Sequence, residues 1–208
     1  MKSHDFRAKS LATALSTLAG YVDAIGFITL GGFFVSFMSG NSTRLGVGIV
    51  THSRDALVAA GLIAAFVAGV TLGSLVGRIA GVHRRPAVLM TVSVLLASAA
   101  SADAIGFAFF SFTAMVLAMG AENAVFESDG EVHIGLTYMT GTLVKIGQRV
   151  AGAVTGGDRL AWLPYLILWI GLISGACAGA ALYPLLGGSA LWISAGAAAV
   201  LAVVSTKR

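Results

Sequence analysis

The stretch Met38-Ser39-Gly40-Asn41-Ser42-Thr43-Arg44-Leu45-Gly46 has a second copy about a hundred positions later, Met139-Thr140-Gly141-Thr142-Leu143-Val144-Lys145-Ile146-Gly147. A related pentamer precedes each copy, Gly20-Tyr21-Val22-Asp23-Ala24 in one case and Gly120-Ala121-Glu122-Asn123-Ala124 in the other. A ladder of glycines at four-residue spacing follows each copy: Gly69, Gly73 and Gly77, then Gly171, Gly175 and Gly179. Three matches in the same order indicate an internal duplication, with repeats at residues 1–103 and 104–208.

The composition is that of a membrane protein. Hydrophobic residues make up 57% of the 208 residues, charged residues make up 11%, and the mean hydropathy is +0.91. Soluble domains carry about 25% charged residues. The chain is long enough for about six to eight spans of ~20 residues, which leaves almost no room for a soluble domain. In such a protein, a duplication is typical of a transporter or channel built around a pseudo-two-fold axis.

The net charge of +4 comes from Lys and Arg residues at the ends of apolar segments. They form no basic face interleaved with aromatic residues, so we interpret them as topological signals and expect no nucleic-acid partner. The basic N-terminus, with Lys2, Arg7 and Lys9, precedes an apolar stretch that continues to Phe37 without a clear cleavage site. This pattern indicates an uncleaved first span in the bilayer.

Each repeat contains four segments. They cover residues 10–30, 33–50, 56–79 and 86–102 in the first half and 104–126, 136–150, 160–185 and 190–204 in the second. Six of them are continuous apolar runs, which predict helices because only a helix satisfies their backbone in lipid. Segments 33–50 and 136–150 carry a small polar cluster in the middle. These two either cross with a break or enter the membrane and turn back.

The basic residues favour six crossings over eight. With eight crossings and a cytoplasmic N-terminus, Arg78, Arg84 and Arg85 would lie outside. With six, the basic residues on the cytoplasmic side are Arg78, Arg84, Arg85, Arg149, Arg159, Lys207 and Arg208. Only Arg54, and Arg44 if it faces that side, then departs from the positive-inside rule. Six crossings place both termini in the cytoplasm, and three per half make the repeats inverted. Eight would make them parallel.

The polar clusters are the candidate site. Gly40 and Gly141 lie where a helix is broken at low cost. A helix that begins there would direct its free N–H groups and positive dipole end into the protein, an arrangement that favours anions or electronegative atoms. Neutral hydrogen-bonding groups would come from Asn41, Ser42, Thr43, Thr140 and Thr142. The alternative is that these small polar residues only let helices pack closely.

Each half also places one acid and one base in or near an apolar segment: Asp23 with Arg44, and Glu122 with Lys145. A charge facing lipid costs several kcal/mol. Two interpretations stay open. Each acid and base form a structural ion pair, or one acid carries a proton while Arg44 and Lys145 contact an anionic or polar solute. Asp23 aligns with Asn123, whereas Glu122 is shifted by one residue, about 100° around a helix. One half would therefore carry the titrating group.

Other features limit the function. The glycine ladders predict close helix contact, either between the repeats or between two protomers of a homodimer. Cys177, the single cysteine, cannot form an intrachain disulfide. His133 lies in an acidic loop without a second His or Cys at ligand spacing, so we expect no metal site. There is no nucleophile elbow, phosphate-binding loop or metal-binding helix. We therefore expect no enzyme activity and no cofactor, and transport driven by a gradient.

The motifs resemble those of the YoaK-like family of bacterial membrane proteins (domain of unknown function 1275). The resemblance is carried by residues 20–27 and 38–43 in the first half and by 120–124 and 137–143 in the second. It implies a multi-pass protein of the bacterial inner membrane with about six spans, and it implies no particular activity. Glu122 departs from the family pattern, which often has glutamine before the asparagine.

The sequence therefore predicts an all-α polytopic membrane helix bundle of two inverted repeats, each with three spans and a broken or re-entrant segment. Our first hypothesis is a secondary transporter with a small polar or anionic solute between segments 33–50 and 136–150. Asp23, Glu122 or Asn123 would handle a proton. The second is a passive channel with two re-entrant half-helices. The third is a membrane scaffold without transport.

Overall fold

The computed structural model describes residues 2–128, 131–132 and 137–206. It contains α1 (Lys2–Thr29), α2 (Met38–Val50), α3 (Arg54–Ala80), α4 (Arg84–Ala104), α5 (Ala108–Glu122), α6 (Met139–Val154), α7 (Leu163–Leu186) and α8 (Ala190–Thr206). Three 3₁₀ turns join them: η1 (Gly81–His83), η2 (Asn123–Phe126) and η3 (Gly187–Ser189). Two short antiparallel strands, β1 (Glu127–Ser128) and β2 (Glu131–Val132), pair Glu127 with Val132. The predicted all-α architecture is confirmed apart from this small hairpin.

Four continuous helical stretches are long and apolar enough to cross a membrane: 8–29, 54–104, 108–126 and 163–206. The second contains 51 residues, about 76 Å of helix at 1.5 Å per residue, which is more than twice the ~30 Å hydrocarbon layer. It is folded back on itself as α3 and α4, and the fourth is folded back in the same way as α7 and α8. Gly81 and Gly187, with φ of 53° and 56°, end α3 and α7 at equivalent places.

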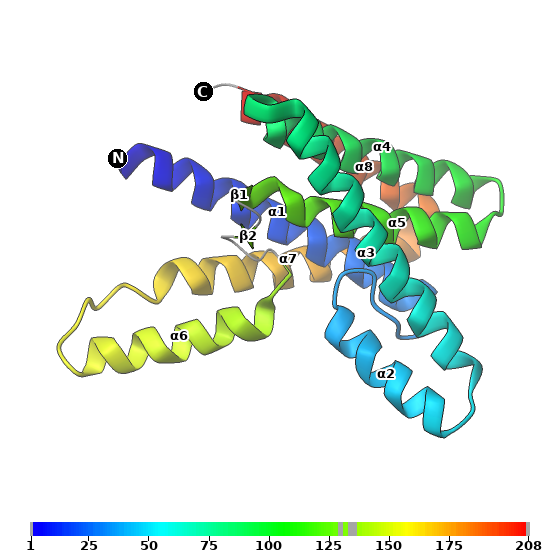
Figure 1. Cartoon of the computed structure of the whole chain (residues 1–208), viewed down its shortest axis with the longest axis horizontal. Helices are drawn as coiled ribbons and strands as arrows, with labels where there is room; N and C mark the ends of the chain where they lie inside the picture. The colour runs from blue at the N-terminus through cyan, green and yellow to red at the C-terminus, as the bar shows by residue number, and fades with distance from the viewer. Residues whose placement is uncertain (1, 129–130, 133–136, 207–208) are drawn as a thin grey trace.

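The principal helix contacts cross between the two halves of the chain. Helix α1 packs along α7, α3 packs along α5, and α4 packs along α8 (Figure 1). In the order of segments, α5 corresponds to α1 and α7 corresponds to α3. Each half therefore places its first helix against the third helix of the other half, and the two fourth helices pack on each other.

The glycine ladders form these contacts. A Cβ atom at Gly175 would collide with the carbonyl oxygen of Thr17 on α1, and one at Gly69 would collide with that of Leu117 on α5. Gly20 and Gly120, from the duplicated pentamers, are packed in the same way on Leu172 of α7 and Phe66 of α3. The ladders thus join the two halves of one chain, which decides between the alternatives left open by the sequence. Small residues at this spacing let the helix backbones approach closely.

The core lies between α1, α4, α5 and α8, where the largest fully buried side chains include Leu15, Leu89, Leu96, Met115, Met119 and Leu191. Hydroxyl groups connect the helices across it. Ser93 Oγ donates to the Ala195 carbonyl at 2.8 Å, Tyr21 Oη to Ala190 at 3.0 Å and Ser16 Oγ to Leu168 at 3.1 Å. Such bonds satisfy polar groups that would otherwise be unpaired in an apolar interior.

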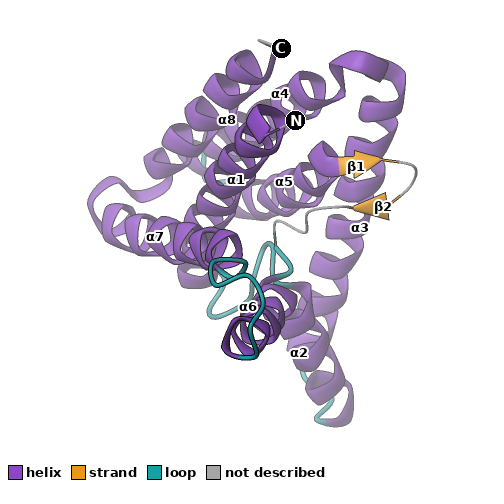
Figure 2. Ribbon diagram, turned by 90° about the vertical axis from the view of Figure 1, so that its left-hand side faces the viewer, coloured by secondary structure: helices purple, strands orange, loops and turns teal. Residues whose placement is uncertain are grey.

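Helices α2 and α6 lie outside this core. They pack on α3 and α7, respectively, and extend from the lower side of the bundle, α6 to the left and α2 to the lower right (Figure 1). The turned view also shows both helices at the lower end of the molecule (Figure 2). With 13 and 16 residues they are about 20 and 24 Å long, shorter than the ~30 Å needed to cross the hydrocarbon layer. Their outer faces are apolar, with Val47, Ile49 and Val50 exposed on α2 and Leu143, Val144 and Val154 on α6.

Some positions used in the sequence predictions have no described structure, and others can be compared with it. His133, Leu136, Lys207 and Arg208 lie outside the described residues. Segment 160–185 begins as a helix at Leu163 rather than at its first residue, since Pro164 stands in the first turn, where a missing N–H costs nothing. Arg54 and Arg78 stand near opposite ends of α3, about 36 Å apart by helix length, so this helix is long enough to cross the ~30 Å hydrocarbon layer.

Candidate solute site between helices α2 and α6

A cavity of about 240 Å³ lies where the two duplicated motifs begin. The first half lines it with Ser36, Phe37, Met38, Ser39 and Phe66, and the second half with Thr137, Tyr138, Met139, Thr140 and Gly141. Four of these residues carry hydroxyl groups on aliphatic side chains, and the rest are apolar or aromatic. Among the described residues, the lining contains no charged side chain.

The chain enters α2 and α6 through the same backbone turn. Met38 N–H donates to the Ser36 carbonyl at 3.2 Å, and Met139 N–H donates to the Thr137 carbonyl at 2.9 Å. The residues between, Phe37 (φ −92°, ψ 76°) and Tyr138 (φ −81°, ψ 55°), have the angles of an inverse γ-turn. Neither provides a side-chain cap to its helix. The first N–H groups of both helices, which carry the positive end of the helix dipole, therefore lie at the cavity.

In the first half, two side chains hold the segment that leads into the cavity. Asp23 Oδ1 accepts hydrogen bonds from the backbone N–H groups of Val35 and Ser36, both at 2.8 Å. Asn41 Oδ1 accepts from Phe34 N–H at 3.1 Å, and Asn41 Nδ2 donates to the Phe34 carbonyl at 2.7 Å. Three consecutive residues are thus tied to α1 and α2. Bonds to a charged acceptor are about twice as strong as neutral ones, so this segment is firmly held.

In the second half, the corresponding side chains make fewer contacts. Thr137 Oγ1, at the position equivalent to Ser36, donates to Asn123 Oδ1 at 3.3 Å. Asn123 Nδ2 donates to the Met119 carbonyl of its own helix at 2.9 Å. Thr142, at the position equivalent to Asn41, donates to the Tyr138 carbonyl at 3.2 Å. Ser36 and Thr137, one hydroxyl residue from each half, are therefore each bonded to the equivalent position, Asp23 or Asn123, of their own half.

Glu122 is set apart from every other described carboxylate. Its side chain is fully buried at the C-terminal end of α5, and within the described part of the chain neither Oε1 nor Oε2 has a hydrogen-bond partner. Its neighbour Asn123 contacts the cavity residue Thr137, so the carboxyl lies one residue from the cavity wall.

The predicted acid–base pairs do not form. Among the described residues, no ion pair joins Asp23 to Arg44 or Glu122 to Lys145. The Arg44 guanidinium lies over the Phe33 ring at 4.5 Å, and Lys145 Nζ lies 5.6 Å from the centre of the Tyr165 ring. Both cations thus contact aromatic faces, which are electronegative. The interpretation as structural ion pairs is wrong because Asp23 is occupied by backbone N–H groups and Glu122 is enclosed by apolar surfaces.

Of the residues in the predicted site, only Thr140 and Gly141 line the cavity. Gly40 lies beneath the rings of Phe34 and Phe37, where a Cβ atom would come within 2.8 Å of Phe37. Ser42 and Thr43 donate to carbonyl groups of their own helix, and Asn41 is directed at Phe34. The sequence analysis missed Ser36 and Thr137. Their signal was present, because both stand two residues before the Met of each duplicated motif.

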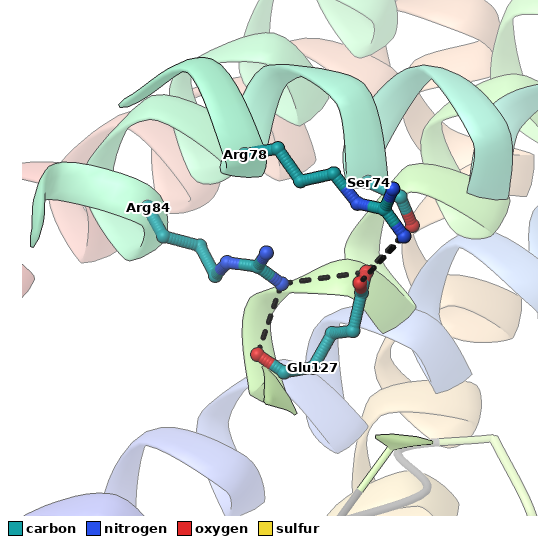
Figure 3. A network of polar contacts seen from close by, with 4 residues as sticks. All are labelled: Ser74, Arg78, Arg84 and Glu127. Atoms are coloured by element: carbon teal, nitrogen blue, oxygen red, sulfur yellow. Dashed lines mark hydrogen bonds and ion pairs between the residues drawn. The ribbon is translucent and has the colours of Figure 1, made fainter. Parts of the chain in front are cut away.

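A second polar cluster, also missed, joins α3, α4 and β1 (Figure 3). Glu127 Oε2 accepts from Ser74 Oγ at 2.6 Å and lies 3.3 Å from Arg84 Nη1, which also donates to the Glu127 carbonyl at 2.9 Å. Arg78 Nη2 lies 4.0 Å from Oε1. Glu127 is buried, whereas Arg78 is exposed. In the sequence, Glu127 belongs to the acidic loop that contains His133, and nothing in its spacing points to two arginines on other segments.

Within the described residues, no three His, Cys, Asp or Glu side chains are grouped so that they could hold a metal ion. The cavity is therefore a set of hydroxyl groups, helix N-termini and apolar surfaces, supported from behind by Asp23, Asn41 and Asn123. These groups can hold a small polar or anionic solute by neutral hydrogen bonds.

Comparison with known proteins agrees with the resemblance seen in the motifs. Residues 11–204 match the model of the family described as "Protein of unknown function (DUF1275)". The chain is 39% identical over 193 residues to a UPF0700 transmembrane protein of Rhizobium meliloti (strain 1021), in an alignment that covers 92% of this chain and 83% of that relative. No solved structure matches the chain. The chain belongs to the DUF1275 family, and it is a membrane protein.

Proposed function

We propose that this member of the DUF1275 family is a small secondary transporter, which binds a small polar or anionic solute between the starts of α2 and α6. The observation that carries the proposal is a cavity to whose lining both copies of the duplicated motif contribute. Two broken segments that meet in this way are typical of transporters in which half-helix N-termini face the solute.

The helix contacts support an arrangement of inverted repeats. The first helix of each half packs on the third helix of the other half, as a pseudo-two-fold axis between the halves requires. Helices α2 and α6 are too short to cross alone, so each half would cross three times, through α1, α3 and α4 or through α5, α7 and α8. An odd number of crossings per half places the repeats in opposite orientations, the basis of alternating access.

The chemistry of the lining selects the class of solute. Hydroxyl groups and helix N-termini donate hydrogen bonds, and no carboxylate competes with an anion at the described wall. A volume of about 240 Å³ corresponds to on the order of eight waters at ~30 Å³ each, which is room for a small solute only. Phe37, Phe66 and Tyr138 would cover its less polar part.

The proposal includes the setting of the protein. It would lie in the bacterial inner membrane with both termini in the cytoplasm, as six crossings and the distribution of Arg and Lys predict. A homodimer remains a prediction, to which the glycine ladders contribute nothing because α1 and α5 of the same chain cover them.

A passive channel through the same two helix starts is the second candidate function. It is favoured by their head-to-head meeting at one cavity, which resembles a selectivity constriction. A transporter accumulates solute against its gradient when a second gradient is imposed, whereas a channel only equilibrates it. A scaffold would have packed, dry contacts in place of this cavity.

Proteoliposomes loaded with a panel of small anions and polar solutes test the proposal. Gly141 lines the cavity, and a Cβ atom added there would meet no neighbour within 4 Å, so Gly141→Leu adds side-chain volume at the cavity wall. Gly147 on the same helix also has open space but lies outside the cavity lining, which makes Gly147→Leu the matched control. We expect flux to fall at least tenfold in Gly141→Leu and to be unchanged in the control. Equal flux in the two variants would contradict the assignment of this cavity as the solute site.

A further inference from the structure

We propose that Glu122 is a proton-binding site and that its proton is exchanged in step with occupancy of the cavity, through Asn123 and Thr137. The coupling rests on the proposed function, whereas the proton site stands on the geometry of Glu122 alone. The sequence left open which acid would act. The contacts of the two acids select Glu122.

The surroundings of Glu122 suit a neutral carboxylic acid. The side chain is fully buried, and neither oxygen has a partner within the described residues. An ionised carboxylate without partners in an apolar interior costs several kcal/mol, and buried charges in proteins are otherwise paired. The carboxyl therefore holds a proton in this state of the protein and releases it as H⁺, leaving the carboxylate, when water or a donor reaches it.

The charged groups on the helices around α5 are all engaged elsewhere. Arg78 of α3 and Arg84 of α4 contact Glu127, and the Arg85 guanidinium lies 5.4 Å from the centre of the Phe126 ring. On α1, Asp23 accepts from Val35 and Ser36, and Tyr21 Oη donates to Ala190. Arg54, Asp55 and Asp103 belong to the opposite ends of α3 and α4. Among the described side chains, none is thus hydrogen-bonded to the Glu122 carboxyl.

A proton suits the site better than a metal cation. Sodium, calcium and magnesium need several oxygen ligands, and Ca²⁺ takes six to eight. Glu122 belongs to no group of metal-ligating side chains among the described residues, and no donor or acceptor there reaches its oxygens. A single carboxyl in a dry site can bind H⁺ but cannot replace the hydration shell of a metal ion.

Asp23 does not suit this role. It lies at the equivalent position of the first half, but its Oδ1 accepts two backbone hydrogen bonds at 2.8 Å. Backbone N–H groups cannot move away without opening the segment that forms the cavity wall. Asp23 is thus a positioning residue.

The connection from Glu122 to the solute is short. Asn123 follows Glu122 directly, and its Oδ1 accepts the hydrogen bond from Thr137, whose side chain lines the cavity. A solute that takes the Thr137 hydroxyl as its own donor would break this bond, so Asn123, the residue next to Glu122, would lose its contact with the cavity wall and keep only its bond to the Met119 carbonyl. Solute binding and proton release would then be linked in both directions, as two coupled binding sites must be.

Carbodiimide labelling tests the proton site without knowledge of the solute. An apolar carbodiimide enters membranes and adds the O–H of a protonated buried carboxyl across its N=C bond, which leaves a stable adduct. We expect the native protein in membranes to gain one adduct, less at higher pH, that peptide mass analysis places at Glu122. Glu122→Gln should not be labelled, whereas Asp23→Asn should be labelled like the native protein. Labelling of Glu122→Gln equal to that of the native protein would overturn the proposal.

The stability of the protein gives an independent measurement. A carboxyl that is protonated in the folded state and ionised in the unfolded chain makes folding less favourable as the pH rises. Between about pH 5 and pH 8, the native protein should therefore lose thermal stability relative to Glu122→Gln. The contributions of Asp23 and Glu127 to the pH dependence cancel in this comparison, because both proteins contain these residues. The proposal would also be overturned if the native protein gains no label and its thermal stability changes with pH in parallel with that of Glu122→Gln. If label is absent but the two curves diverge as described, the proton site is supported.

The Gly141→Leu variant separates this inference from the proposed function. It closes the cavity but leaves Glu122 in place, so it should lose flux and keep the carbodiimide adduct. Flux in Gly141→Leu equal to that of the native protein would contradict the solute site, but it would not affect the evidence for the proton site. In the native protein, a pH gradient should drive accumulation of the transported solute, and Glu122→Gln should equilibrate the solute without accumulation. Accumulation by Glu122→Gln equal to that of the native protein would overturn the coupling.

Discussion

The approaches to α2 and α6 have the same backbone turn but are held by different side chains. At α2, Asp23 and Asn41 bond four backbone groups of residues 34–36. At α6, Asn123 accepts one bond from the Thr137 side chain, and Thr142 bonds only its own helix. The first approach is anchored by a carboxyl group that accepts two backbone hydrogen bonds, and the second is not.

This difference shows how the two repeats could come to serve different purposes. The inverse γ-turns at Phe37 and Tyr138 keep the two helix starts directed at one cavity. With that geometry kept, the acid of the second half stands one residue earlier, at Glu122, and has lost the backbone partners that Asp23 has. A rigid half and a half with an unpaired carboxyl follow from a shift of one position, about 100° around the helix.

Substitution of Asp23 and of its equivalent Asn123 should give the largest difference between the halves in the free energy of unfolding. Asp23→Ala leaves the Val35 and Ser36 N–H groups without their acceptor, and bonds to a charged group contribute about 1.5–3 kcal/mol each. We expect a loss of at least about 3 kcal/mol in the free energy of unfolding. Asn123→Ala should cost about 1 kcal/mol, since it loses one bond to Thr137 and one within its helix. Unfolding by a denaturing detergent in mixed micelles would measure both, and equal losses would contradict the comparison.

Asn41 and Thr142, the equivalent residues early in α2 and α6, should show a smaller difference in the free energy of unfolding than Asp23 and Asn123. Asn41→Ala removes both bonds to Phe34 and leaves its N–H and carbonyl unpaired, at about 2 kcal/mol. Thr142→Val keeps the shape of the side chain and loses only a bond to its own helix, so it should cost less than about 0.5 kcal/mol. The same unfolding measurement applies. Asn41→Asp keeps the acceptor for Phe34 N–H but sets a carboxyl against the Phe34 carbonyl at a fully buried position, so it should cost at least as much as Asn41→Ala. A loss for Asn41→Ala as small as that of Thr142→Val would refute the anchoring role of Asn41.

The smallest effects concern the ends of α1 and α5. Phe27 on α1 packs on the Phe34 ring at 5.0 Å, whereas Glu127, its counterpart after α5, binds Arg84 and Ser74 (Figure 3). Arg84→Met should cost about 1 kcal/mol because its bond to the Glu127 carbonyl is partly buried. Arg78→Met should leave the melting temperature unchanged, since its contact is long and exposed. If thermal unfolding ranks Arg78 above Arg84, the description of this cluster is wrong.

The glycine ladders and the polar clusters differ in how far they could be predicted. Spacing by four residues puts Gly69, Gly73 and Gly77 on one helix face, because that is a property of the helix itself. Which helix covers the face depends on how the two halves dock, and two partners were open until the contacts with Leu117 and Thr17 were seen. The meeting of the two duplicated motifs was predicted, but most of the cavity lining was not. Four of the ten lining residues, Ser36, Phe37, Thr137 and Tyr138, stand just before the motifs, where the turns at Phe37 and Tyr138 set the direction of the chain, and Phe66 comes from α3.

The amino-acid sequence by itself determined that this protein crosses a membrane with helices and is made of two related halves. Apolar composition and internal similarity are properties of the chain, whatever packs on what. Tertiary structure alone decided that Asp23 holds a loop, that Arg44 and Lys145 lie on aromatic rings, and that Glu122 is enclosed without a partner. The reason is that the residue type determines which ionisable group a side chain carries, whereas its partner and its access to water depend on segments far away along the chain.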